Sequence, residues 1–185
     1  MIQHVGGEAR IIRTPDQLED AAKLILPGVG AFDHGIGSLR HGDWVKPLEQ
    51  AVHERRVPIM GICLGMQLLT GGSEEGQQPG LGWIDAHARR FRPSDSRLKV
   101  PHMGWSEVRQ RRADELLPVS ANPRRFYFVH AYRVECFDPA DVLLECDYGE
   151  IFVAAFRRAN IWGFQFHPEK SHRFGMELFR QFLEV

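Results

Sequence analysis

The chain has few cysteines, three in 185 residues, at positions 63, 136 and 146. Their number is odd and none are closely paired, which argues against a disulfide framework and a cysteine-based zinc site. No two of the nine histidines stand i, i+4 with a carboxylate in the pattern of a metal site. We therefore expect a protein of a reducing compartment that needs neither a metal nor a cofactor.

An excess of charge and long apolar runs are also missing. Lys and Arg number 23 and Asp and Glu 24, which gives a net charge of -1. Short arginine clusters, such as residues 109–112, are interrupted by apolar residues, so they favour a solvated face or a protein contact. No run approaches the length of a membrane span, and no signal peptide is expected. The composition indicates a cytoplasmic protein without nucleic-acid or membrane partners.

The hydrophobic pattern predicts a single α/β domain over residues 1–185. Apolar segments at 9–13, 23–26 and 57–61 alternate with helical patterns at 44–55 and 64–69. This alternation predicts an open, mostly parallel sheet flanked by helices. The second half has few helices between its strands, which predicts a mixed sheet or an added antiparallel layer. Further strands are predicted at 82–91, 124–134, 142–146, 152–156 and 161–166, and a last helix at about 174–183.

The start of the chain departs from this pattern. Residues 1–5 resemble the end of a helix that Gly6 and Gly7 would terminate. An α/β chain normally has a strand before its first helix, and none is present here. We expect that a preceding strand is missing from this sequence. A native protein whose mass places its N-terminus at Met1 would contradict this.

The most informative segment is the Gly-x-Cys-x-Gly motif at residues 61–65, which ends an apolar run and begins a helical pattern. This is the layout of a nucleophile elbow, whose sharp turn presents a side chain at the carboxyl end of a sheet. A thiol near a helix N-terminus is favoured as thiolate. Cys63 is thus a candidate nucleophile, and a buried structural cysteine in a glycine-rich turn is the alternative.

A second segment, residues 161–170, predicts a buried strand that ends at His167. Pro168 keeps His167 extended, so Glu169 projects to the same side. A carboxylate there can bond one imidazole nitrogen and direct the other to the sulfur. In isolation the segment would more often be a strand-end histidine capped by a carboxylate. Together with Cys63 it favours a Cys-His-Glu triad.

The glycine-rich loop at residues 27–30 follows a short apolar strand. Acyl transfer requires backbone N–H groups aimed at the oxygen that becomes negative. Leu64, the residue after the nucleophile, would supply one donor, and Val29 or Gly30 the other. A phosphate-binding loop is the competing interpretation, but the glycine spacing and the lysine of such loops are missing.

Together these motifs resemble the class I glutamine amidotransferases, which have a flavodoxin-like fold. The segments Val-Pro-His-Met-Gly-Trp at 100–105 and Tyr-Phe-Val-His-Ala-Tyr at 127–132 more narrowly resemble the glutaminase subunits of imidazole glycerol phosphate synthase. The five motifs occur in order over nearly the whole chain. Family members have a strand and a glycine-containing loop before the first helix, which agrees with the missing segment.

The resemblance implies that Cys63 attacks the amide of L-glutamine, that His167 protonates the departing ammonia, and that Glu169 orients His167. Water would then hydrolyse the γ-glutamyl thioester. By their positions in the motifs, the residues that bind glutamine would be Gln67, Glu75, Ala131 and Tyr132. For Glu75, an exposed acid at a helix end is the alternative.

The resemblance also implies a partner, a (β/α)8-barrel synthase subunit that receives the ammonia and makes imidazole glycerol phosphate for histidine biosynthesis. The contact would involve His102, Met103, Gly104 and Trp105, with Lys170 as a nearby charge. A solvent-facing tryptophan suits an interface, and a core tryptophan is the alternative.

Ser106 stands where many members have asparagine. This difference, with residues 31–35 and 171–176, resembles a paralogous branch that supplies ammonia to surface-sugar amidation in lipopolysaccharide pathways. A non-catalytic binding or regulatory subunit is a further alternative. A cysteine peptidase of the same broad fold would explain Cys63 and His167 but not Gln67 or Tyr132.

Overall fold

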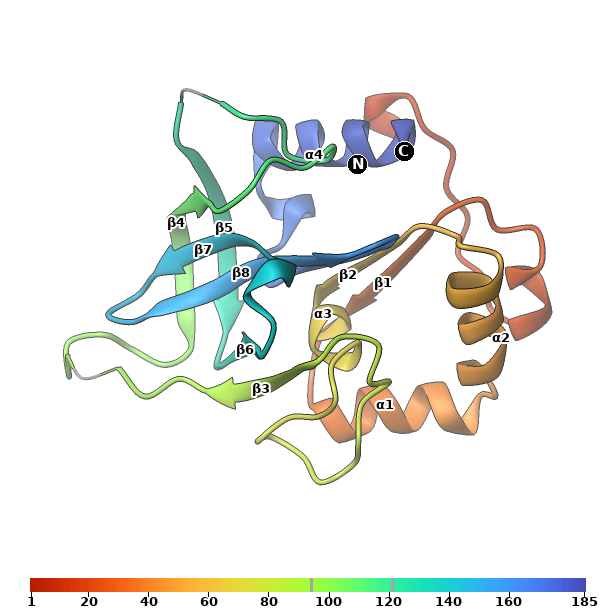
Figure 1. The fold of residues 1–185 in the computed structure, drawn as a ribbon, viewed down its shortest axis with the longest axis horizontal. Helices are drawn as coiled ribbons and strands as arrows, with labels where there is room; N and C mark the ends of the chain where they lie inside the picture. Colours follow the sequence, from red (N-terminus) through yellow and green to blue (C-terminus); the bar gives the residue numbers. More distant parts are fainter. Residues whose placement is uncertain (94, 121) are drawn as a thin grey trace.

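A computed structural model describes residues 1–93, 95–120 and 122–185 (Figure 1). Its strands form one mixed sheet in the order β1-β2-β9-β8-β7-β4-β5, with β6 paired to β3 and β8. The first three strands of this order are parallel and the other pairs are antiparallel. The strands are β1 (Leu24–Gly28), β2 (Ile59–Cys63), β3 (Ala86–Arg90), β4 (His102–Gln110), β5 (Arg124–His130), β6 (Tyr132–Cys136), β7 (Val142–Asp147), β8 (Ile151–Arg158) and β9 (Ile161–Phe164). The predicted α/β fold with a mixed second half is confirmed.

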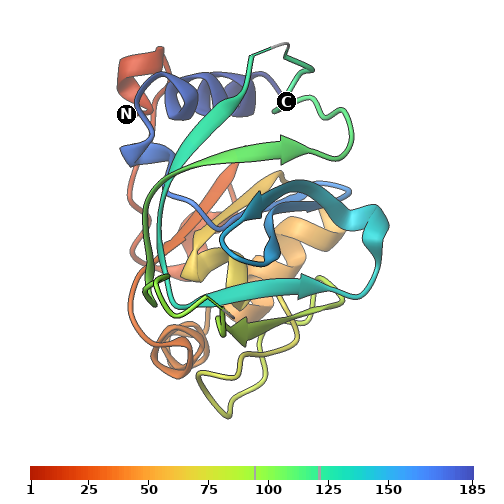
Figure 2. The same cartoon turned by 90° about the vertical axis from the view of Figure 1, so that its left-hand side faces the viewer.

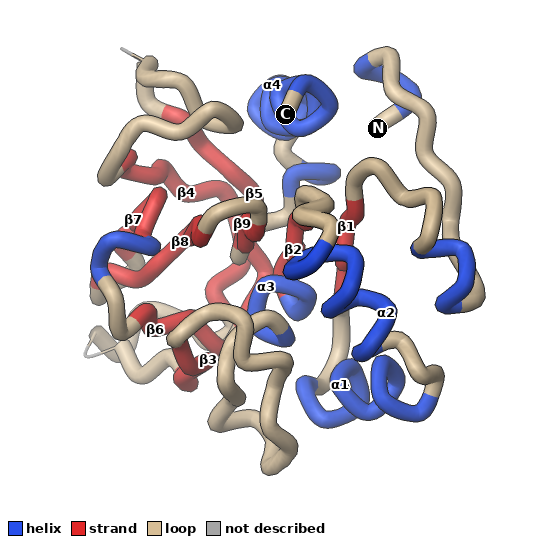
Figure 3. The backbone as a smooth tube through the Cα atoms, turned by 45° about the vertical axis from the view of Figure 1, so that its right-hand side comes forward, coloured by secondary structure: helices blue, strands red, loops and turns tan. Residues whose placement is uncertain are grey.

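Helices cover both faces of the parallel part (Figures 1 and 3). The helix α4 (His172–Glu184) lies on one face, next to a short 3-10 turn, Gln3–Val5. On the other face lie α1 (Phe32–His41), α3 (Leu64–Leu68) and α2 (Val45–Glu49), and α2 continues into a π-helical turn, Gln50–Glu54. No helix in the described ranges is long and apolar enough to cross a membrane.

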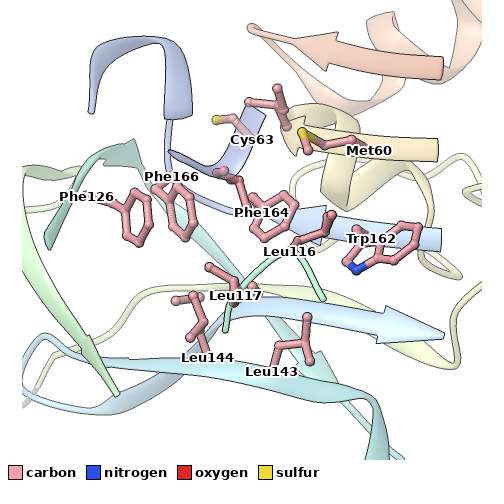
Figure 4. Packing of buried hydrophobic residues seen from close by; sticks show 14 of the residues in the cluster. Met60, Cys63, Leu116, Leu117, Phe126, Leu143, Leu144, Trp162, Phe164 and Phe166 are labelled. Atoms are coloured by element: carbon pink, nitrogen blue, oxygen red, sulfur yellow. The ribbon is translucent and has the colours of Figure 1, made fainter. Parts of the chain in front are cut away.

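The strands β2 and β9 form the centre of the core. Every residue of both strands is buried, as expected for parallel strands with helices on both faces. Figure 4 shows Met60 of β2 and Phe164 of β9 within one apolar cluster, close to Cys63. The end of β2 that carries the candidate nucleophile is therefore held on both sides by packed side chains.

The antiparallel strands curl away from the parallel part (Figure 2). The predicted strand 124–134 is two strands that meet at Ala131, because the chain changes partner there: β5 pairs with β4, and β6 pairs with β3. The predicted strand 82–91 is limited to β3, and β4 was not predicted at all. The prediction of a strand at 9–13 is wrong. Residues 9–13 have no regular secondary structure, and four of the five are exposed, with Ile11 at 81%, so the segment buries no apolar face that would hold it against the sheet.

Candidate active site

The turn between β2 and α3 has the geometry of a nucleophile elbow. Cys63 ends β2 with φ 53° and ψ -109°, a left-handed conformation that is costly for any residue with a Cβ. A Cβ on Gly61 would lie 2.7 Å from Leu69 Cδ1, and one on Gly65 would overlap the carbonyl oxygen of Leu26. The two glycines are therefore required because strand and helix approach too closely for any side chain.

A cavity of about 320 Å³ opens beside the elbow, at the carboxyl ends of β1 and β2. This volume lies at the lower end of the range for small-molecule sites. The cavity collects side chains and backbone from segments far apart in sequence. The predicted site residues that line it are Val29, Gly30, Cys63, Leu64, Gln67, Glu75, Ala131, Tyr132, His167 and Lys170; Pro101, Val129 and His130 also line it.

His167 and Glu169 form the expected pair. Nδ1 of His167 lies 2.7 Å from Oε1 of Glu169, which fixes the ring. The neighbouring Cys63 sulfur and then the Glu169 carboxylate raise the pKa of His167 to about 9. Burial acts to raise the pKa of Glu169, but the bond from His167 and further contacts hold it below its usual range. The imidazole thus carries its proton at neutral pH, next to a sulfur that it can stabilise as thiolate.

The second imidazole nitrogen of His167, Nε2, is free to act on a bound substrate. Nε2 of His167 is buried and has no hydrogen-bond partner in the described part of the chain. Because Nδ1–H is taken by Glu169, Nε2 is the nitrogen that faces Cys63 and the cavity. A buried N–H without an acceptor is costly, which makes this proton available to a bound substrate.

The backbone near the sulfur provides donors for an oxyanion. Leu64 is the first residue of α3, so its N–H has no acceptor within the helix. On the other side of the cavity, Gly30 has φ 99°, which only glycine adopts easily, and Val29 is 79% exposed. Both sides of the cavity can thus present N–H groups to an oxyanion on the carbon that the sulfur attacks.

Glu75 lies on a loop that is tied to the first helix. Its Oε2 accepts the N–H of Phe32 at 2.8 Å, at the N-terminus of α1. The carboxylate of Asp33 accepts the N–H groups of Gln77 and Gln78, and these bonds lower the pKa of Asp33. The loop therefore holds Glu75 at the rim of the cavity, with a second carboxylate oxygen available to a substrate ammonium group.

Two buried histidines form a hydrogen-bonded chain that begins at the cavity wall, where His130 lies, and continues away from it to His102. Nδ1 of His130 lies 2.7 Å from the carbonyl oxygen of Tyr132, so it must carry a proton, and Nε2 must be an acceptor. His102 therefore donates from Nδ1 to His130 Nε2 at 3.2 Å, and its own Nε2 accepts from the Ser106 hydroxyl at 2.9 Å. Both imidazoles are neutral, since burial lowers the pKa of His102 to about 4 and that of His130 to about 3.

From the two buried neutral histidines, His102 and His130, we expect the protein to lose stability on mild acidification. The unfolded histidines take up protons near pH 6.5, whereas the folded ones do so only near pH 4 and pH 3. Their contribution to the free energy of unfolding is therefore complete above pH 6.5 and is lost as the pH falls toward 4, by up to about 1.4 kcal/mol per pH unit for each histidine. Urea unfolding at several pH values between 4 and 7 measures this slope.

The variant His102→Gln removes one of the two protonation sites. We expect its slope between pH 4.5 and 6.5 to be shallower than that of the wild type, because one proton fewer is taken up on unfolding. An equal slope in the two proteins would contradict the assignment of His102 as a buried neutral imidazole.

The residues expected at a partner interface divide into two groups. Met103 is 61% exposed and Trp105 is 40% exposed, on the outward face of β4. The expectation for His102 is wrong: its side chain is 1% exposed and stacks between Phe128 and Tyr148. Successive strand residues point to opposite faces, so His102 and Met103 cannot both reach the surface.

Four residues at the site escaped the sequence analysis as functional candidates. Pro101, Val129 and His130 line the cavity, and Gln165 is fully buried with Nε2 3.8 Å from the Cys63 sulfur. A polar residue between two phenylalanines, directly after a strand buried on both faces, is a detectable signal for Gln165, because such a side chain must find a buried partner.

Comparison with known proteins agrees with this geometry. The family model described as "Glutamine amidotransferase class-I" matches residues 3–185. A solved structure described as a glutamine amidotransferase superposes with a TM-score of 0.75, at 21% identity, over 99% of this chain and 88% of that one. PurLQS from Thermotoga maritima gives a TM-score of 0.77 at 20% identity, over 99% of this chain and 88% of that chain. The chain belongs to the class I glutamine amidotransferases and is an enzyme of the glutaminase type.

Within this class the most informative relatives share one name. Imidazole glycerol phosphate synthase subunit HisH 2 of Pseudomonas aeruginosa is 50% identical over 100% of this chain and 91% of its own length. The protein of the same name from Methanococcus maripaludis is 44% identical over 100% of this chain and 91% of its own length. The chain therefore belongs to the HisH family of the class.

Proposed function

We propose that this chain acts as one domain, the glutaminase subunit of an imidazole glycerol phosphate synthase, and hydrolyses L-glutamine to glutamate and ammonia. The observation that carries the proposal is that Cys63 and His167 line the same cavity, with Glu169 bonded to the histidine. The identity of 50% to a HisH subunit over the full chain supports the particular pathway, histidine biosynthesis.

The proposed reaction begins at the sulfur. The Cys63 thiolate attacks the side-chain amide carbon of glutamine, and the N–H groups of Leu64 and of Val29 or Gly30 bind the resulting oxyanion. His167 donates its Nε2 proton to the amide nitrogen as the C–N bond breaks, which releases ammonia and leaves a γ-glutamyl thioester. A water molecule then gives a proton to His167 and attacks the thioester, which releases glutamate and restores the thiolate.

The substrate would be held by its two ends. Glu75, at the rim of the cavity, suits the α-ammonium group, since a carboxylate pairs with a cation. Gln67, Ala131 and Tyr132 also line the cavity and offer backbone and amide groups.

Ammonia that escapes into water becomes ammonium and is lost as a nucleophile. We infer a heterodimer with a (β/α)8-barrel synthase in the cytoplasm, in which the partner covers the cavity and receives the ammonia, so that the whole complex has lyase activity. The exposed Met103 and Trp105, with Gly104 between them, and Lys170 at the cavity provide a surface for this contact. Trp105 stacks on His172 at 5.4 Å, which holds its ring ready as an apolar anchor.

The test is glutamate production by the chain alone and with purified synthase partner and the synthase's ribonucleotide ligand. We expect slow hydrolysis by the chain alone and an increase of about tenfold or more with partner and ligand, because closure of the site would complete the catalytic arrangement. The exposed Val29 loop gives the physical reason, since a bound partner would exclude water from it.

The same assay separates the alternatives. Stimulation by a sugar amidotransferase and not by the histidine-pathway synthase would move the chain to the surface-sugar branch. Fast constitutive hydrolysis by the isolated chain would contradict the proposed coupling. An absence of turnover with either partner would favour a non-catalytic subunit.

A further inference from the structure

A buried glutamine contacts the candidate nucleophile from behind the cavity. Gln165 directly follows β9 and is 0% exposed, and its Nε2 lies 3.8 Å from the Cys63 sulfur. It is not among the described residues that line the cavity, so its side chain does not reach the position of a bound substrate. Any effect of Gln165 on the reaction must therefore act through the sulfur.

The hydrogen bonds of the neighbouring residues fix which end of this amide faces the sulfur. The carbonyl oxygen of Tyr132 can only accept, so the Gln67 atom 3.3 Å away must be the donor Nε2. That same Nε2 lies 3.1 Å from the Gln165 side chain, which must therefore present its acceptor, Oε1. The remaining atom of the Gln165 amide is Nε2, so an N–H group points at Cys63.

The anchor of this arrangement is itself held firmly. The Tyr132 carbonyl also accepts the N–H of His130, the inner end of the histidine chain described above. One carbonyl thus orients two side chains by the same chemistry: His130 on one side and Gln67 on the other. Gln67 Nε2 donates both to this carbonyl and to Gln165 Oε1, and Gln165 Nε2 then donates to the sulfur.

We propose that the side-chain amide of Gln165 positions the Cys63 nucleophile by donating a hydrogen bond to its sulfur, and that Gln67 sets the orientation of that amide. A neutral thiol can also donate weakly to the Val129 carbonyl, at 3.9 Å. A thiolate cannot donate, so in the reactive form the contact with Gln165 remains and the contact with Val129 becomes unfavourable. The amide therefore holds the sulfur in place when it is charged.

Stability alone gives little reason for this pair of glutamines. Two buried polar partners can be replaced together by apolar groups of similar shape at nearly no cost in folding free energy. Gln165 stands between Phe164 and Phe166 in the core, and with apolar side chains at both 67 and 165 the Tyr132 carbonyl would still accept from His130. Keeping a bonded amide at this point is explained by a task at the sulfur.

The experiment measures the rate at which iodoacetamide alkylates Cys63, followed by mass spectrometry of the peptide that contains it. We expect Gln165→Met to lower this rate about tenfold, the loss of a weak hydrogen bond to a charged group. Gln165→Glu keeps the acceptor for Gln67 but removes the donor and brings negative charge toward the thiolate, so we expect an equal or larger decrease. In the complex with the synthase, kcat for glutamine should fall by a similar factor while KM changes little, because Gln165 does not line the cavity and Gln67 keeps its bond to the Tyr132 carbonyl.

The matched control is Asn160→Ala, at the opposite end of β9. Its side-chain amide donates to the carbonyls of Val52 and Val57. The change therefore removes two partly buried hydrogen bonds but no contact with the sulfur. We expect this variant to lose stability in urea but to keep the wild-type rate of alkylation. Unchanged alkylation in both Gln165 variants would overturn the proposal, as would a decrease in Asn160→Ala of the same size.

This inference rests on the proposed glutaminase function, and the two can fail separately. A wild-type protein that is alkylated rapidly at Cys63 in a Gln165-dependent manner, but that produces no glutamate, would contradict the function and leave the positioning contact intact. A rise in KM at unchanged kcat in Gln165→Met would instead support the function and overturn the role assigned to Gln165.

Discussion

Cys63→Ala is expected to abolish glutamine hydrolysis and to leave the use of free ammonia by the complex intact. Removing a covalent nucleophile commonly costs about 10⁴-fold or more in kcat, because the remaining groups cannot form the intermediate. The synthase site is on the other subunit in the proposed complex, so saturating ammonium salts should still yield product. The two measurements are glutamate release and product formation from ammonia, on the same purified complex.

His167 provides a check on the same experiment. The pKa of His167 is raised to about 9 mainly by Cys63, so loss of the sulfur should lower the pKa of this histidine. NMR titration of the histidine in Cys63→Ala would detect the change. If Cys63→Ala lost both glutamine and ammonia activities while the complex still assembled, the sulfur would have a role other than the one proposed.

The second large effect is on folding stability and concerns Gly65, two residues after the nucleophile. A Cβ on Gly65 would overlap the Leu26 carbonyl oxygen and lie 2.9 Å from the carbonyl carbon. Both atoms belong to the backbone of β1, which pairs with β2, so neither can move without disturbing the ladder. We expect Gly65→Ala to destabilise the protein by about 3 kcal/mol or more, at the upper end of what overpacking causes.

The control for Gly65→Ala is another glycine within a helix. In α1, a Cβ on Gly37 would meet no atom closer than 3.6 Å, and alanine favours helix by about 1 kcal/mol over glycine. Gly37→Ala should therefore raise the urea midpoint, whereas Gly65→Ala should lower it. Equal shifts of the same sign would show that the contact between α3 and β1 is not the cause.

The sequence predicted the parallel half of the fold well because its two inner strands, β2 and β9, are buried on both faces. Residues 57–61 and 161–166 are apolar without alternation, which is what β2 and β9 require. The strand β4 was missed for the opposite reason. Its inward side chains include His102 and Ser106, whereas Met103 and Trp105 face outward, so its alternation suggests the wrong face.

The site residues that could be predicted are those whose pattern is local in the sequence. Cys63, His167 and Glu169 follow from local spacing at a strand end, and the cavity collects the first two with the third bonded to His167. Gln165 and the pairing of His102 with His130 depend on contacts between segments 28 to 102 residues apart. Such contacts leave no periodic trace in the chain. They become visible only when the directions of the hydrogen bonds are followed through space.

The backbone at Cys63 has a consequence for the evolution of this protein. A left-handed conformation at a residue with a side chain costs about 1–3 kcal/mol, against a total folding free energy of about 5–15 kcal/mol for an ordinary domain. Glycine would relieve that cost but would remove the sulfur. A lineage under no selection for hydrolysis would therefore gain robustness by replacing the cysteine, so its persistence in a descendant is a mark of continued use.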